Sequence, residues 1–208
     1  MQVSFLSVIR ETNSYLGGDI TDSKILEKLP SDYRELLHQE NGFILFNGGL
    51  HVRGAVLHPD WHSLRYAWLG EAGLHRLFPA VEESDVPFGE DCVGDQFLLR
   101  SGSVYKLAAE TGTVECMAMD LETFLRRALE NPLESLGLHP LLQLQREGGT
   151  LEPGKLLNVY PPFCTKESAQ GVSLRAVPAL QQIGFLADFA RQIANLPTGT
   201  KVRIKTVE

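Results

Sequence analysis

Apolar residues recur every three to four positions in several stretches of the chain, which is the spacing of amphipathic helices. The clearest stretch covers residues 30–40, where Pro30 and Ser31 open the helix and Asn41-Gly42 ends it. Asp120 is placed to cap a second clear helix, which Pro132 ends. Further short helices are predicted over residues 22–29, 63–69, 141–147 and 185–194.

Short apolar or alternating runs separated by turn residues predict β-hairpins. Asn47-Gly48-Gly49 joins residues 43–46 to 50–53, and Ser101-Gly102-Ser103 joins residues 95–100 to 104–107 as a three-residue loop. Further strands are predicted over residues 114–118, 156–160, 172–177 and 201–205, the last of which suits a sheet edge because it carries lysines. Hairpins bracketed by helices indicate an α+β fold, a mostly antiparallel β-sheet backed by helices.

The chain has 208 residues, enough for one or two domains. No Gly/Ser linker divides it, and Asn131-Pro132 is the best candidate boundary. We therefore expect a core domain with an N-terminal lead-in over residues 1–130, and a C-terminal α/β extension over residues 131–208 that packs on it. The first residues contain neither the basic region nor the apolar run of a secretory signal, and no segment has the length of a membrane span. This pattern predicts a cytoplasmic protein with no membrane contact.

Charge is distributed unevenly along the chain. The formal net charge is −7, which argues against a nucleic-acid partner because such proteins normally carry a basic surface. Residues 71–95 contain one basic residue, Arg76, and seven acidic residues, so this stretch holds −6 of the total. An acidic stretch of this kind is either a solvated loop or a surface that attracts a basic protein partner by long-range forces.

Residues that could carry chemistry are few. His51, His58 and His62, with Asp60, could bind a metal, but a turn at Pro59 does not direct them to one point. The three cysteines are widely spaced and form no CxxC pair, which suits a reducing compartment. The carboxylates beside Cys92 are expected to raise the pKa of its thiol, which makes the thiol a poorer nucleophile.

Carboxylates and glycine-rich turns offer no clearer catalytic site. Glu90 with Asp91 or Asp95 could act as an acid/base pair, although turn and capping chemistry before a strand explains these residues better. The chain contains no phosphate-binding glycine loop, GxSxG, HExxH or dinucleotide fingerprint. We therefore predict no catalytic residue, no metal site and no cofactor.

Two motifs resemble a known family when taken together and in order. The segment from Leu29 to Leu37, followed by Asn41-Gly42, resembles the opening helix of the SUKH superfamily, which includes the yeast cell-wall-synthesis regulator and many bacterial toxin-immunity proteins. Val86-Pro87-Phe88-Gly89, followed by Gly94-Asp95-Gln96-Phe97, resembles its central signature, "(I/V)PFG" and then "GD" leading into a strand. The similarity covers about residues 20–130.

The resemblance implies an antiparallel sheet backed by helices and a binding function without enzymatic activity. It favours an immunity protein that binds and neutralises a cognate toxin, such as a nuclease, whose basic surface would meet acidic residues. The expected partner-binding residues are the acids in and before the signature: Glu82, Glu83, Asp85, Glu90, Asp91 and Asp95. Two alternatives remain open, a regulatory or scaffold domain for a non-toxin partner and a metal-dependent hydrolase that uses residues 51–62.

Overall fold

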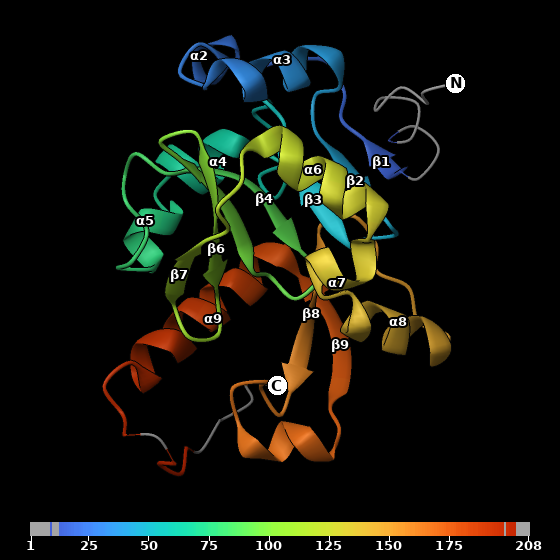
Figure 1. The fold of residues 1–208 in the computed structure, drawn as a ribbon, viewed down its shortest axis with the longest axis vertical. Helices are drawn as coiled ribbons and strands as arrows, with labels where there is room; N and C mark the ends of the chain where they lie inside the picture. The colour runs from blue at the N-terminus through green and yellow to red at the C-terminus, as the bar shows by residue number, and fades with distance from the viewer. Residues whose placement is uncertain (1–8, 10–12, 198, 203–208) are drawn as a thin grey trace.

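The structure, a computed structural model, describes residue 9, residues 13–197 and residues 199–202 (Figure 1). In this part of the chain, one antiparallel sheet contains seven strands, and each strand pairs with the next one in sequence. The strands are β1 (Asn13–Leu16), β2 (Phe43–Leu45), β3 (Leu50–Val52), β4 (Val86–Asp91), β5 (Gln96–Arg100), β6 (Ser103–Ala108) and β7 (Thr113–Cys116). The predicted α+β fold with an antiparallel sheet backed by helices is confirmed.

Helices precede, interrupt and follow this meander of strands: α2 (Ser23–Leu26), α3 (Ser31–Gln39), α4 (Leu64–Leu69), α5 (Leu74–Leu77), α6 (Leu121–Glu130), α7 (Pro132–Leu136), α8 (His139–Arg146), α9 (Ala179–Ile193) and a 3₁₀ helix over Lys166–Gln170. Their starts follow ordinary capping chemistry. The side chains of Asp22, Ser63 and Asp120 each accept a hydrogen bond from a backbone N–H three residues further on, which satisfies a donor that the first helical turn leaves free.

The two faces of the sheet bury different apolar clusters because side chains alternate along each strand. On β5, Phe97 and Leu99 join a cluster with Tyr33 of α3 and Phe124 of α6, whereas Leu98 faces the other way. That second cluster brings together Leu98, Leu107 of β6, and α5 and α9. Phe97 and Phe124 lie with ring centroids 4.6 Å apart at the centre of the first cluster.

The C-terminal part forms a separate two-stranded sheet, β8 (Lys155–Tyr160) and β9 (Ser173–Pro178), followed by α9. The N–H of Leu157 donates to the carbonyl of Cys92 at 2.8 Å, so β8 is joined to the turn after β4. Leu157 belongs to the first apolar cluster and Leu156 to the second. Residues after 131 therefore contribute to the core on both faces of the main sheet.

Several predicted elements differ from the observed ones. The β5–β6 loop has two residues, Ser101 and Gly102, because Arg100 pairs with Ser103 and both loop residues have positive φ, as a type I′ turn requires. Glu90 lies in the buried strand β4 and not in a turn before a strand, whereas Asp91 ends β4 and starts the turn that leads into β5. The elements β1, α5 and α7 were not predicted. Of the predicted strand over residues 201–205, Lys201 and Val202 have no regular structure and the rest lies outside the described residues.

A membrane span was not expected from the sequence. No helix in the described part of the chain combines the length and the apolar character needed to cross a bilayer.

Candidate functional site

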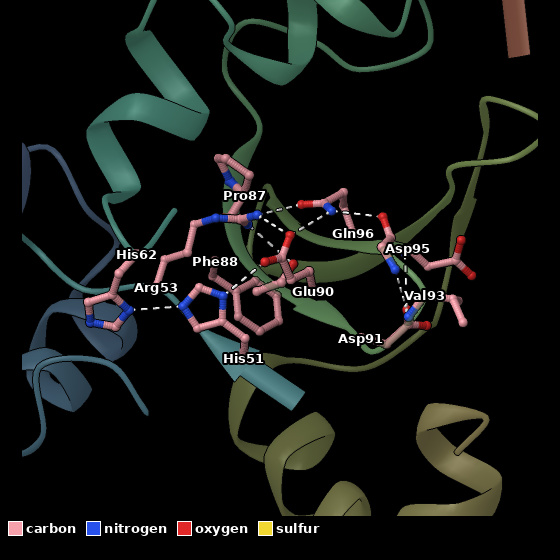
Figure 2. A network of polar contacts seen from close by, with 12 residues as sticks. His51, Arg53, His62, Pro87, Phe88, Glu90, Asp91, Val93, Asp95 and Gln96 are labelled. Carbon is pink, nitrogen blue, oxygen red and sulfur yellow. Dashed lines mark hydrogen bonds and ion pairs between the residues drawn. The ribbon is translucent and has the colours of Figure 1, made fainter. Parts of the chain in front are cut away.

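A row of polar side chains crosses the middle of the sheet on one face (Figure 2). His51 on β3 lies opposite Glu90 on β4, and Glu90 lies opposite Gln96 on β5. His51 Nδ1 is 2.9 Å from Glu90 Oε1, and Gln96 Nε2 donates to Glu90 Oε2 at 3.0 Å. The row ends at His62, whose Nδ1 is 2.9 Å from Nε2 of His51. Strand pairing thus brings together His51, Glu90 and Gln96, and His62 joins them from the loop before α4.

Arg53, which follows β3, supplies the positive charge of this network. Its guanidinium donates to Glu90 Oε2 at 2.7 Å, to Gln96 Oε1 at 2.7 Å and to the carbonyl of Pro87 at 3.0 Å. The hydroxyl of Tyr33 in α3 donates to the backbone carbonyl of Arg53 at 2.5 Å. Arg53 is therefore bonded through its backbone to α3 and through its side chain to β4 and β5.

The protonation states in the network follow from burial and from the Arg53 charge. Burial raises the pKa of Glu90, but the Arg53 charge and the hydrogen bonds from His51 and Gln96 outweigh it and hold the pKa at about 2. Burial lowers the pKa of His62 to about 3 and also lowers the pKa of His51. At neutral pH the network holds one buried ion pair, Arg53 and Glu90, and two neutral imidazoles. Because Glu90 is ionised, Nδ1 of His51 carries the proton that it donates.

The network has no room for a substrate. Its five side chains belong to residues that are at most 6% exposed, and the gap beside His51 and Glu90 measures about 10 Å³, the space of a single water. Trp61, Leu156 and Ala179 line that gap, so residues from the C-terminal part cover the row. The arrangement can fix the register of β3, β4 and β5, but it does not present a reactive group to solvent.

The Val86-Pro87-Phe88-Gly89 motif has a physical explanation in this network. Phe88 is fully buried beside Tyr33 and Phe124, with its carbonyl accepting from the N–H of Arg53 at 2.8 Å. A Cβ on Gly89 would lie 2.7 Å from the backbone carbonyl oxygen of His51, so the neighbouring strand can approach only a glycine. The irregular register between Pro87 and Gly89 accommodates the proline in a central strand.

The Gly94-Asp95 part of the signature belongs to a tight turn after β4. Asp91 accepts the N–H groups of Val93, Gly94 and Asp95 on one carboxylate oxygen at 3.0–3.1 Å. Lys106 lies 2.9 Å from Asp95 and 3.4 Å from Asp91. Burial and the Asp95 charge raise the pKa of Asp91, and the Lys106 charge and the backbone donors oppose the increase. Turn chemistry therefore explains Asp91 as predicted, whereas Glu90 belongs to the strand network.

The six acids predicted to bind a partner do not form one surface. Glu82 and Glu83 are exposed on the loop between α5 and β4. Asp85, Glu90 and Asp91 are at most 3% exposed and are bonded inside the fold, so in this conformation they cannot touch a partner. The side chain of Asp95 is 20% exposed and is paired with Lys106.

Asp85 anchors the exposed loop from inside. It accepts the N–H of Glu82 at 2.8 Å and both Nε and Nη2 of Arg100, at 2.7 and 2.6 Å. Arg100 also lies 3.0 Å from the carboxylate of Glu82, and the indole N–H of Trp68 donates to the carbonyl of Glu83 at 2.9 Å. The backbone of the loop is therefore fixed on both sides of the two exposed glutamates.

The predicted histidine cluster is only partly assembled. His51 and His62 meet, but the side chain of His58 is 85% exposed and lies 3.3 Å from Asp60 instead. Within the described residues, no three His, Cys, Asp or Glu side chains are arranged to hold a metal ion. Cys92 is fully buried, and burial followed by the Asp91 charge raises its pKa, in the direction predicted from the neighbouring carboxylates.

The sequence prediction did not find the roles of Arg53 and Gln96. Their partners lie 37 and 6 positions away from them along the chain. The sequence signal that could have revealed these roles is the run from Val86 to Gly89. If this run is interpreted as a strand that continues into Glu90, the Glu90 side chain is expected inside the protein. A buried carboxylate needs a cation as its partner.

Comparisons with known proteins add information on the fold only. No protein-family model matches the chain, and no curated protein is similar to it in sequence. Among solved structures, the crystal structure of Atu4351 from Agrobacterium tumefaciens is similar, with a TM-score of 0.52 over 88% of each chain and 12% sequence identity. At that identity the likeness shows a shared α+β fold and nothing about activity.

Proposed function

We propose that this protein is a non-enzymatic binding protein that neutralises a cognate basic toxin in the cytoplasm, with the loop carrying Glu82 and Glu83 as its contact surface. The observation that carries the proposal is that the acidic residues between positions 82 and 95 differ in exposure. Two adjacent glutamates face solvent on an anchored loop, while the acids around them are bonded inside the fold. Because the backbone of this loop is anchored, the two glutamates lose little backbone freedom when they meet a basic surface.

Two further considerations support a binding role. The group of ionisable side chains around Glu90 is buried and bonded within the sheet, which leaves no room for a substrate beside it. The resemblance of residues 20–130 to the SUKH superfamily favours toxin immunity. A nuclease is a suitable toxin because its phosphate-binding surface is basic and would be blocked by carboxylates.

The proposal expects a toxin gene beside this one, and the test is co-expression with the active domain of that toxin, together with a pull-down of that domain. Wild-type protein should protect the cells and bind the toxin. The variant Glu82→Lys/Glu83→Lys should bind at least tenfold more weakly, and the binding of the wild-type protein should weaken as salt increases.

A matched control makes the same change of charge at another place on the surface. Glu130→Lys/Glu134→Lys alters two exposed glutamates at α6 and α7 and should bind as wild type. Circular dichroism and thermal melting establish that both variants fold. Unchanged binding by the Glu82/Glu83 variant would exclude this loop as the contact surface. Failure of the wild-type protein to protect would exclude the immunity role itself.

A further inference from the structure

A cavity of about 300 Å³ lies between the main sheet and the C-terminal part. One side consists of Ala108, Glu110 and Thr111, where β6 turns into β7. The other side consists of α9 and the loop that follows β8, and Figure 1 shows α9 passing beneath β6 and β7. A volume of this size lies at the lower end of the range of small-molecule sites.

The walls of the cavity are largely apolar and aromatic. Val159 comes from β8, Phe163 from the following loop, and Phe185, Leu186 and Phe189 from successive turns of α9. The rings of Phe185 and Phe189 are stacked with centroids 6.2 Å apart. Phe163 is 45% exposed, so it lies at the mouth of the cavity. Such walls favour a hydrocarbon group.

Glu110 supplies the charge of the cavity. One of its carboxylate oxygens accepts the N–H of Phe163 at 3.0 Å and the other accepts the N–H of Cys164 at 2.9 Å, so the group is fixed in position. Asp95, the second carboxylate at the cavity, is paired with Lys106, whereas no Lys, Arg or His in the described part of the chain forms a salt bridge with Glu110. Burial raises the pKa of Glu110, the expected result for a half-buried carboxylate that lacks a cation.

Cys164, the thiol among the residues that line the cavity, does not indicate covalent chemistry. Burial and the Glu110 charge raise the pKa of the Cys164 thiol to about 11, so the thiolate nucleophile is scarce at neutral pH. The cavity residues also do not belong to any metal-binding arrangement of three or more ligands among the described residues. A reversible organic ligand fits these properties better than a metal ion or a covalent adduct.

We propose that this cavity binds a free primary amine with an aromatic or branched hydrocarbon group, whose ammonium donates to Glu110 while the hydrocarbon packs between Phe163, Phe185 and Leu186. The ammonium supplies the positive counter-charge that Glu110 lacks, and the phenylalanine rings can also contact the cation through their faces. The assignment does not depend on the proposed toxin-binding function, because the cavity and the loop with Glu82 and Glu83 share no residue.

The experiment measures binding of three probes of similar size by calorimetry at pH 7.5: 2-phenylethylamine, 2-phenylethanol and 3-phenylpropionate. The amine should bind at least tenfold more tightly than the alcohol, and the carboxylate should bind more weakly than the alcohol. Glu110→Gln should weaken the amine at least tenfold and leave the alcohol unchanged. Phe185→Ala should weaken both the amine and the alcohol.

Glu115→Gln is the matched control, because Glu115 is exposed on β7 and does not line the cavity. It should bind all three probes as wild type, and melting curves should show that every variant folds. Equal binding of amine and alcohol, unchanged amine binding by Glu110→Gln, or no binding of the amine at 10 mM by the wild-type protein would overturn the proposal. A fourth probe, Nα-acetyl-lysine methylamide, stands for a lysine side chain. If it binds more tightly than 2-phenylethylamine, the assignment to a small aromatic or branched amine is overturned and a lysine of a partner protein is indicated.

Discussion

Replacing Glu90 with glutamine removes the negative charge of the buried network and should destabilise the fold strongly. Glu90 accepts from Arg53 at 2.7 Å and from Gln96 at 3.0 Å, and it lies 2.9 Å from Nδ1 of His51. Glutamine has one acceptor oxygen for these three donors, and it leaves the guanidinium of Arg53 buried without a counter-ion.

Removing one partner of a buried ion pair costs about 3–5 kcal/mol. For a chain of this length, each kcal/mol shifts the melting temperature by about 2–4 °C, so Glu90→Gln should melt roughly 6–20 °C below wild type. The assay is urea unfolding followed by circular dichroism, with the free energy taken from the midpoint and the slope. Glu115→Gln on the exposed strand β7 makes the same chemical change and should stay within about 0.5 kcal/mol of wild type.

A double-mutant cycle separates the ion pair from general damage to the core. Arg53→Met also removes hydrogen bonds to Pro87 and Gln96 and should be destabilising by itself. In the double variant no unpaired charge remains, so its destabilisation should be smaller than the sum of the two single effects by about 1–3 kcal/mol. Additive effects, or a Glu90→Gln variant within 1 kcal/mol of wild type, would refute the assignment of a buried ion pair.

Three further predictions concern acid stability and two glycines. The pKa of His62 is about 3 in the folded protein and about 6.5 in the unfolded chain, so the unfolded chain binds more protons between these two pH values. His62 should therefore lower the free energy of unfolding by about 2 kcal/mol when the pH falls from 7 to 5. The His62→Gln variant should lose that part of the fall in urea titrations at the two pH values, and an unchanged fall would contradict the assignment. Gly89→Ala should cost about 1–3 kcal/mol in the same assay, since its Cβ meets the His51 carbonyl oxygen, and a neutral effect would show that β3 can move away. Gly184→Ala, inside α9 with open space at the Cβ position, should instead stabilise by about 0.5–1 kcal/mol, and a loss of stability would contradict the geometry of that helix face.

The parts of the fold that local patterns determine could be predicted from the sequence. Asp120 caps its helix as predicted, because a cap depends on residues three positions away. The hairpin with Gly102 was also found, although its loop is one residue shorter than predicted.

The polar network could not be predicted, because its contacts depend on strand pairing across the sheet. Nothing near Glu90 in the sequence indicates that Arg53 is its partner, so the carboxylate was interpreted as part of an acidic surface. Strand β4 was also missed, because Pro87 and Gly89 are residues that usually argue against a central strand. Here, the irregular register at Pro87 and the close approach of β3 explain both residues.

The cover that Leu156 and Ala179 provide over His51 and Glu90 has a consequence for how this architecture can vary. In a shortened chain without the C-terminal part, the Arg53–Glu90 pair would be opened to water and would lose most of its ability to discriminate between strand registers. A shorter protein with the same seven-stranded meander should therefore carry different residues at positions 51, 90 and 96. We therefore expect the presence of the C-terminal part and the identity of this row to vary together.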